Sequence, residues 1–363
     1  FYSCVAGWVY CYTYKAATGA FADITKEGAE ALFSATIGAG GAEASFFSST
    51  VLAPIFWQVF VLAVVGTIIS LGVAKGIERA IKVMMPALFV LLIACVIRAL
   101  TLPGAADGLY FLFHVDFKQV TPAVVLAAMG LAFFKLSLGM GTMITYGSYF
   151  TDDADLSLSP LKIAVADICI SMLAGLAVFP TVFSFGVEPG AGPGLLFITI
   201  PLVFSQMPFG QVLLFAFFLL TAFAANGAML SLVEVPTIWM AEEFNISRRR
   251  SALINCVIIG AVGILAACSA DGTGYLGAAT LFGKGFFDLF DYLSSNVTMP
   301  IGGLCIAIFT GYVMRRADLF DELSNHGTLR NDGRAAFIRV LLRYVTPVLV
   351  LVIFLNALGV IKL

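Results

Sequence analysis

Long apolar runs separated by short polar loops dominate the pattern of this chain. A helix needs about 20 apolar residues to cross a bilayer, and backbone groups in lipid must be satisfied within the segment. The runs that meet this length with little or no charge are Val51–Ala74, Val83–Leu102, Val120–Phe150, Ile163–Val187, Gly210–Val233, Ala252–Ala270, Tyr292–Met314 and Tyr344–Ile361. Phe1–Gly19, interrupted only by Lys15, looks like the outer part of one more. The pattern predicts an all-α polytopic membrane protein with about nine helices.

Positive charge recurs in every second loop between these runs. The Lys- and Arg-containing loops hold Lys75–Lys82, Lys162, Arg248–Arg250 and Arg315–Arg343. The intervening loops carry little beyond Lys26, Lys118 and Lys284. Because Lys and Arg accumulate in cytoplasmic loops, the first set is expected to be cytoplasmic.

Two of the intervening segments, 20–50 and 189–210, are expected to be structured outer loops of a single transmembrane bundle covering residues 1–363. Asp23–Ser34 has the mixed pattern of a short surface helix. The second segment is uncharged, but Pro193, Pro201 and Pro208 favour a re-entrant hairpin or lid over a further span.

Composition excludes several classes of protein. Hydrophobic residues make up 60% of the chain and charged residues 12%, against about 25% charged in soluble domains. Lys and Arg (20) do not exceed Asp and Glu (22), which argues against a nucleic-acid partner. With only two His, seven Cys without metal-ligand spacing, and no nucleophile beside a base, we expect neither an enzyme nor a bound cofactor.

The most informative stretch is Phe133–Gly141, at the centre of Val120–Phe150. Ser137, Gly139 and Gly141 weaken a helix halfway through the bilayer, as in transporters that build polar sites from unwound helices. Small residues also let neighbouring helices approach closely, so spacing alone leaves both interpretations open.

Lys135 favours a functional break. A charge at the bilayer centre costs at least ~2.5–3.5 kcal/mol and usually has a partner. Asp167 is the only charge in the following run, and the two are expected to pair. Hydropathy places Asp167 nearer the cytoplasmic edge, so direct contact requires the break to shorten the earlier helix.

These residues resemble the neurotransmitter:sodium symporter family, in order along essentially the whole chain. Phe133–Gly141 is similar to the unwound sixth helix of that family, and Tyr2–Trp8 to the middle of its third. Further similar segments are Lys75–Glu78, Lys82–Pro86, Leu102–Ala105, Gly192–Phe197, Ser231–Glu234 and Pro300–Leu304. The resemblance implies the inverted-repeat fold of the leucine-transporter type, here from the third helix to the eleventh. Because the chain opens with Phe1 inside an apolar stretch, the first two helices are expected to precede it.

The resemblance also implies site residues. Tyr2 matches the tyrosine that meets the substrate carboxylate, and Leu232 an aliphatic pocket position. Phe134, Ser137 and Met140 match pocket-lining positions of the sixth helix. The gate positions are matched by Asp291 on the outer side and by Tyr149 and Glu242 on the inner side. The flexible Met140 replaces a common aromatic, which together with Phe134 and Leu232 predicts an apolar or small neutral amino acid as substrate.

The cation sites depart from the family pattern. Lys135 stands where a threonine hydroxyl normally binds the first sodium ion, and Asp167 falls at or next to an amide ligand. At the second site Gly227 and Ala228 replace hydroxyl side chains, leaving the Ala224 carbonyl and Asn226. Na⁺ is therefore the expected coupling ion by family, although its usual side-chain ligands are partly missing.

The resulting prediction is a multi-pass secondary transporter of the cell membrane, in a bacterial inner membrane, that moves a neutral amino acid by alternating access. Two alternatives stay open. One is a sodium-independent or proton-coupled transporter that uses Lys135 as a substitute cation; the other is a transport-incompetent binding or scaffold fragment. The expected partners are the amino acid and the lipid bilayer, and the sequence does not fix an oligomeric state.

Overall fold

The fold is mostly helical in the computed structural model, which describes residues 1–22, 24–40, 45–150, 155–185, 193–205, 208–270 and 272–361. The chain divides into two compact units. The first combines Phe1–His114 with Ser171–Phe290, and the second combines Val115–Ile170 with Asp291–Leu363.

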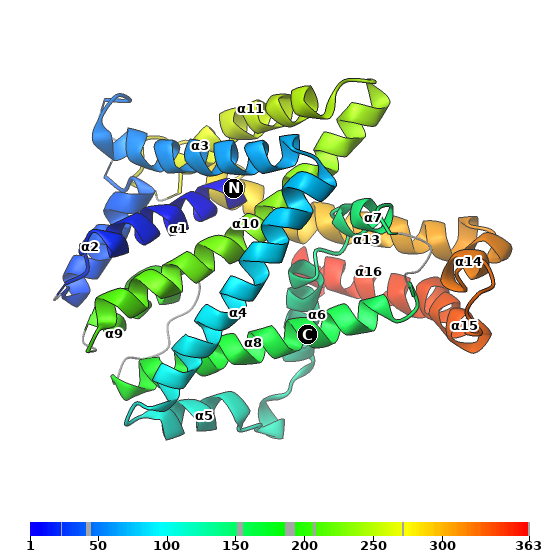
Figure 1. Cartoon of the computed structure of the whole chain (residues 1–363), viewed down its shortest axis with the longest axis horizontal. Helices are drawn as coiled ribbons and strands as arrows, with labels where there is room; N and C mark the ends of the chain where they lie inside the picture. The colour runs from blue at the N-terminus through cyan, green and yellow to red at the C-terminus, as the bar shows by residue number, and fades with distance from the viewer. Residues whose placement is uncertain are drawn as a thin grey trace. The chain divides into compact units, whose positions relative to one another are not determined.

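Helices of the first unit come from both of its chain segments (Figure 1). They are α1 (Tyr2–Ala17), α2 (Lys26–Ile37), α3 (Ser49–Ser70), α4 (Arg79–Leu100), α5 (Ala105–Phe113), α9 (Ile200–Ser205), α10 (Gly210–Glu243) and α11 (Arg248–Ala267). π-helical turns at Val73–Glu78 and Leu195–Thr199 lead into α4 and α9. Strands β1 (Thr280–Leu281) and β2 (Lys284–Gly285) form a hairpin whose turn residues, Phe282 and Gly283, both have positive φ, as the tight turn requires.

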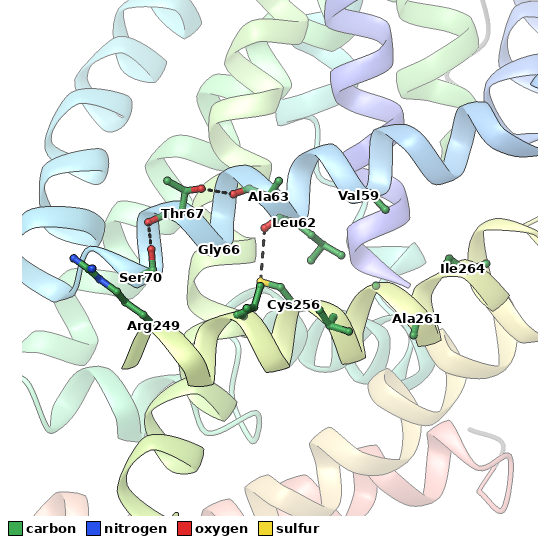
Figure 2. Close-up of a pocket in the computed structure, with 13 residues that line it drawn as sticks. Val59, Leu62, Ala63, Gly66, Thr67, Ser70, Arg249, Cys256, Ala261 and Ile264 are labelled. Atoms are coloured by element: carbon green, nitrogen blue, oxygen red, sulfur yellow. Dashed lines mark hydrogen bonds between the residues drawn. The ribbon is translucent and has the colours of Figure 1, made fainter. Parts of the chain in front are cut away.

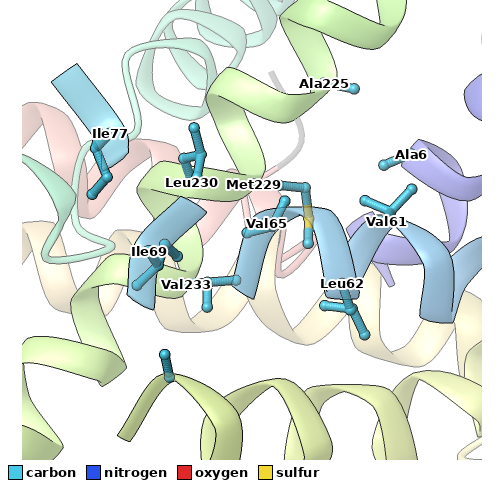
Figure 3. Close-up of a cluster of buried hydrophobic side chains, with 11 residues drawn as sticks. Ala6, Val61, Leu62, Val65, Ile69, Ile77, Ala225, Met229, Leu230 and Val233 are labelled. Atoms are coloured by element: carbon cyan, nitrogen blue, oxygen red, sulfur yellow. The ribbon is translucent and has the colours of Figure 1, made fainter. Parts of the chain in front are cut away.

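The centre of the first unit is the packing of α3 against α1, α10 and α11 (Figures 1 and 2). Gly7 of α1 permits close approach, because a Cβ there would lie 2.9 Å from the backbone nitrogen of Gln58. The buried cluster in Figure 3 contains Ala6, Val61, Leu62, Val65, Ile69, Ile77, Ala225, Met229, Leu230, Val233 and Ala252. Its members in α3 and α10 recur every three or four residues, the helical period that keeps one face against its neighbours.

The second unit contains the break predicted in the sequence. The helices within this unit are α6 (Pro122–Lys135), α7 (Thr142–Gly147), α13 (Met299–Ile308), α14 (Arg316–Leu323), α15 (Asp332–Val340) and α16 (Thr346–Ala357). A 3₁₀ turn at Phe117–Gln119 precedes α6, and π-helical turns lie at Leu293–Thr298, Phe309–Val313 and Leu341–Val345. Helices α8 (Ser159–Ser184) and α12 (Phe286–Tyr292) each contain a boundary between the units.

A polar contact in the second unit fastens the loop before α8 to α14 and α15. Asp155 accepts hydrogen bonds from the hydroxyl (2.6 Å) and backbone nitrogen (2.9 Å) of Ser157. Its other oxygen lies 3.7 Å from Arg334 Nη1. The buried Asn331 donates to Ser157 Oγ (3.2 Å) and to the carbonyl of Leu323 (2.6 Å). We call Asp155, Ser157, Asn331 and Arg334 the loop clasp.

Among the described residues, seven helices are long and apolar enough to cross a membrane. They are Ser49–Ser70, Gly76–Leu100, Ser159–Ser184, Gly210–Glu243, Arg248–Ala267, Phe286–Val313 and Asp332–Ala357. Each coincides with one of the predicted apolar runs. The remaining run, Val120–Phe150, is divided between α6 and α7, and α1 has only 16 residues. The assignment of nine helices as the third to the eleventh rests on the resemblance and stays a prediction.

The two predicted outer loops contain short helices. Helix α2 occupies Lys26–Ile37, close to the expected surface helix; its predicted first residue, Asp23, lies outside the described residues. Leu195–Ser205 is helical and buries Phe197, Ile200 and Phe204. Residues 189–192 and 206–207 lie outside the described part, so the hairpin or lid stays a prediction.

Candidate functional site

The helix that begins at Pro122 ends at Lys135 and does not resume until Thr142. Between them, Ser137 has φ of 53°, and Gly139 and Gly141 each have φ of 81°. Left-handed backbone cannot continue an α-helix, and only glycine adopts it without steric cost. The predicted break at mid-run is therefore confirmed.

The break lies against α13. A Cβ on Gly139 would overlap the carbonyl oxygen of Met299, and one on Gly302 would overlap the carbonyl oxygen of Gly139. Gly303 leaves room in the same way for the ring of Phe133. Close packing and an unwound backbone were alternative interpretations of these small residues, and the structure contains both.

Lys135, the last residue of α6, pairs with Asp167 of α8 within the second unit. Lys135 Nζ lies 3.1 Å from Asp167 Oδ2, and the two side chains are 39% and 31% exposed. The predicted pair is thus confirmed. The end of α6 at Lys135 agrees with the expectation that direct contact requires the break to shorten the earlier helix.

The five predicted substrate-pocket residues belong to two different units. Phe134, Ser137 and Met140 lie at or next to the break in the second unit. Phe134 is 37% exposed, and Ser137 and Met140 are half-buried. Tyr2 on α1 and Leu232 on α10 lie in the first unit and are both half-buried. Within the second unit the structure groups the first three residues around one interruption of the backbone.

A cavity of about 390 Å³ in the second unit adjoins the break. Phe133 and Phe134 line it together with Asp291, the predicted outer-gate residue. The Asp291 carboxylate accepts a hydrogen bond of 3.0 Å from Ser295, which lines the same cavity. The structure therefore places a predicted gate residue and a predicted pocket residue on one cavity.

The two predicted inner-gate residues lie in different units. Tyr149 follows α7 in the second unit, is half-buried, and has its ring centroid 6.3 Å from that of Tyr146. Glu242 is exposed near the end of α10 in the first unit. Their gating role stays a prediction.

Ala224 and Asn226, the predicted second cation position, lie on a continuous α10. Residues two positions apart in sequence point in directions 200° apart around an α-helix, so Ala224 is exposed whereas Asn226 is buried. Asn226 Nδ2 donates a hydrogen bond to the hydroxyl of Tyr10 on α1. Asn226 Oδ1 is buried and has no hydrogen-bond partner among the described residues. Tyr10 was not identified from the sequence, where it is one of several tyrosines in an apolar run.

Glu234 anchors α10 to α11 rather than lining a site. Its side chain is fully buried, and Arg248 Nη2 donates to its two oxygens at 2.6 and 2.5 Å. Arg248 Nε also donates to the carbonyl of Ile69 at 3.0 Å. These contacts give Glu234 a structural role. In the sequence, Arg248 indicates only the orientation of its loop, although a lone buried Glu signals the need for such a partner.

The chain matches the sodium:neurotransmitter symporter family over residues 48–362. It is 36% identical to the uncharacterised sodium-dependent transporter YhdH of Bacillus subtilis, over 100% of this chain and 77% of that protein. It is 33% identical to an uncharacterised sodium-dependent transporter of Haemophilus influenzae, over 98% of this chain and 75% of that one. The crystal structure of MhsT in complex with L-phenylalanine matches with a TM-score of 0.84 and 37% identity, over 98% of this chain and 77% of that chain.

These matches agree with the apolar helices, the interruption between α6 and α7 and the order of motifs. The family is one of transporters rather than enzymes. The chain therefore belongs to the sodium:neurotransmitter symporter family and is a multi-pass transporter of the cell membrane.

Proposed function

We propose that this chain carries a neutral amino acid across the membrane together with Na⁺, by alternating access. The observation that carries the proposal is the break between α6 and α7, which lies next to the Lys135–Asp167 pair in the middle of an apolar run. Unwound backbone in a membrane is tolerated where it is buried in protein or lines a cavity, and it offers amides and carbonyls to a polar substrate. Membership of a sodium symporter family supports Na⁺ as the coupling ion.

The residues proposed to bind the substrate are Tyr2, Phe134, Ser137, Met140 and Leu232. Tyr2 would supply a hydroxyl to the carboxylate, and the apolar side chains would hold an uncharged substrate side chain. The match to a transporter solved with L-phenylalanine supports an amino acid of this class. Asp291, Tyr149 and Glu242 are proposed as the residues that close the pathway on its two sides.

The Lys135 ammonium is proposed to take the place of one sodium ion. A tethered cation beside Asp167 supplies the same positive charge without an ion from solution, which lowers the number of Na⁺ ions per substrate. The second cation position is proposed at Asn226 and the carbonyl of Ala224. The support is that Asn226 Oδ1 is buried without a hydrogen-bond partner among the described residues, since such an oxygen gains by meeting a cation.

Uptake into proteoliposomes tests the coupling ion. Radiolabelled leucine or phenylalanine is offered with an inward Na⁺ gradient, with choline in place of Na⁺, and with a pH gradient alone. We expect accumulation only with Na⁺. Equal accumulation in choline would reject Na⁺ coupling, and accumulation driven by the pH gradient alone would indicate protons instead.

Competition in the same assay tests the substrate class. Unlabelled leucine, alanine and phenylalanine should each inhibit uptake, whereas lysine and glutamate should not. Stronger inhibition by a charged amino acid would contradict the proposed apolar pocket while leaving Na⁺ coupling intact. The two parts of the proposal therefore fail separately.

A further inference from the structure

A groove of about 760 Å³ runs between α3 and α11, wholly within the first unit (Figure 2). The two helices touch closely, because a Cβ on Gly66 would lie 2.8 Å from Cys256 Sγ. Small residues keep the groove open along this contact line; among them are Ala63 and Ala261, which are both exposed.

The sides of the groove are apolar and face outward. Val59, Leu253 and Val257 line it and are 48%, 67% and 62% exposed. Both helices have the length and hydropathy of membrane spans. In a bilayer this groove is therefore filled by hydrocarbon, and the question is whether one kind of lipid is preferred.

Positive charge at one end of the groove favours a lipid with an anionic head group. Arg249 lies at the start of α11 and, in Figure 2, extends along the end of the groove beside Ser70. Its neighbour Arg248 is turned inward to Glu234, whereas Arg249 is exposed and forms no hydrogen bond or ion pair with the described residues. The alternation of positive loops places this end of the groove at the cytoplasmic surface. Guanidinium and phosphate form strong, directional hydrogen bonds.

Two hydroxyl groups beside Arg249 add a second element of recognition. Thr67 donates its proton to the carbonyl of Ala63 (2.7 Å), and Ser70 donates its proton to the carbonyl of Thr67 (2.8 Å). Both hydroxyl oxygens therefore remain as acceptors. They suit a head group that carries hydroxyl donors next to its phosphate.

The length of the groove fits a lipid tail. Arg249 and Ile264, at its two ends, are 15 residues apart on α11, which corresponds to about 22 Å. One leaflet contributes about half of the ~30 Å hydrocarbon core. An acyl chain of that leaflet whose phosphate lies at Arg249 can thus occupy about two-thirds of the length of the groove.

We propose that this groove is a binding site for one phosphatidylglycerol molecule of the cytoplasmic leaflet. Its phosphate binds Arg249, its glycerol hydroxyls donate to Thr67 and Ser70, and one acyl chain lies between α3 and α11. Basic pockets between membrane helices on the cytoplasmic side are a recognised mode of binding anionic head groups.

Native mass spectrometry of the purified full chain, with added dioleoyl-phosphatidylglycerol or dioleoyl-phosphatidylcholine, tests the proposal. The first phosphatidylglycerol should bind about fivefold more tightly than phosphatidylcholine, the ratio expected for one arginine at a membrane surface. Arg249→Gln should abolish this ratio. Arg250→Gln is the matched control, since it removes an adjacent exposed arginine that does not line the groove, and should leave the ratio unchanged within twofold.

A groove-filling variant tests the tail. Ala261→Trp adds a large side chain to the groove without removing charge, and should weaken the first binding event of both lipids at least threefold. All variants should keep the melting temperature of the wild type in phosphatidylcholine. Equal binding of the two lipids to the wild type, an equal loss in Arg250→Gln, or a dimer that Ala261→Trp dissociates would overturn the proposal.

Discussion

Lys135 carries a positive charge at the end of α6, directly before the break in the backbone. Its ammonium is 3.1 Å from the Asp167 carboxylate, so each side chain has an opposite charge at hand in an apolar surrounding. Removing one partner of such a pair leaves a charge uncompensated, which is costly in a low-dielectric site. An ion from solution can replace the missing positive charge but not the missing carboxylate.

Lys135→Thr is therefore expected to increase the dependence of uptake on Na⁺. A hydroxyl replaces the ammonium, and Asp167 then attracts an ion, so the Hill coefficient for Na⁺ should rise by up to about one. The measurement is initial uptake rate against Na⁺ concentration at constant ionic strength. Asp167→Asn serves as the opposite control and should lower uptake without raising the Hill coefficient. An unchanged Na⁺ dependence in Lys135→Thr would contradict the substitute-cation role.

Asn226 offers a second test at the residue scale. Asn226→Leu removes the unpartnered Oδ1. The Na⁺ concentration for half-maximal uptake should then rise about tenfold, because one contact to the ion, as strong as a hydrogen bond to a charged group, is lost. Tyr10→Phe is the matched control, because it removes the partner of Asn226 Nδ2 but leaves Oδ1 in place. A similar shift in both variants would mean that Asn226 acts only through its contact with Tyr10.

Breaking the Glu234–Arg248 pair is expected to destabilise the folded protein. Glu234→Ala leaves the Arg248 guanidinium without its buried carboxylate and should cost about 3–5 kcal/mol of the free energy of unfolding. The double variant Glu234→Leu with Arg248→Met should recover much of this loss, since an apolar pair needs no charge compensation. Thermal unfolding in detergent measures both. A single variant as stable as the wild type would show that the pair contributes little.

The Lys135–Asp167 and Glu234–Arg248 pairs were not equally predictable. For Lys135, the apolar runs contained a single acidic candidate, and the sequence was sufficient. For Glu234, the arginine stretch at Arg248–Arg250 offered three neighbours, and only the turn between α10 and α11 decides which one points inward. Tyr10 could not be predicted as the partner of Asn226, because that contact depends on how α1 rotates against α10.

At the scale of elements, the break between α6 and α7 is the feature on which the proposed site depends. Glycine and serine in an apolar run indicated its position, and Lys135 favoured a break over close packing alone. The packing of the break against α13 could not be predicted from the sequence. Gly302 and Gly303 lie some 160 residues away and are equally typical of an uninterrupted membrane helix.

Gly139→Ala tests the backbone of the break. Alanine at φ of 81° is strained, and its Cβ would overlap the carbonyl of Met299, so at least about 1–2 kcal/mol of stability and most of the uptake should be lost. Gly147→Ala is the matched control. It lies at the end of α7 with nothing within 4 Å of the added Cβ, and should be neutral or slightly stabilising. Equal effects of the two substitutions on melting temperature would show that the contact with α13 is not tight.

At the scale of the whole molecule, the apolar runs predicted seven continuous spans correctly because length and hydropathy alone decide whether a helix can cross a bilayer. Several of these helices are longer than the predicted apolar runs. Their extra length was not predicted, because the polar residues at the helix ends extend into the membrane–water interface. The docking of the loops was also beyond the sequence. The loop clasp joins Asp155 to Arg334 across 179 positions, and no local pattern signals such a contact.

The loop clasp predicts a dependence of stability on pH. The hydrogen bond from the Ser157 side chain is the main cause that holds the pKa of Asp155 below its ordinary value, helped by backbone donors and Arg334. A carboxyl with a lowered folded-state pKa stabilises the protein above its unfolded pKa of about 3.9, and this contribution disappears as pH falls through the folded pKa. Asp155→Asn should therefore melt slightly below the wild type at pH 7. The gap should close below about pH 4, whereas a gap that is constant with pH would point to a role other than the charge.

The contact of Gly139 with Met299 and Gly302 limits how the second unit can move. Backbone lies against backbone there, with no side chain between the two segments to act as a compressible layer. Sliding α13 along the break would press the Met299 carbonyl against the backbone of Gly139 and the Gly139 carbonyl against the backbone of Gly302. A transport cycle that changes access to the break must therefore move the break and α13 as one rigid body. Two spin labels placed on α7 and α13 should then report the same distance in Na⁺ and in choline.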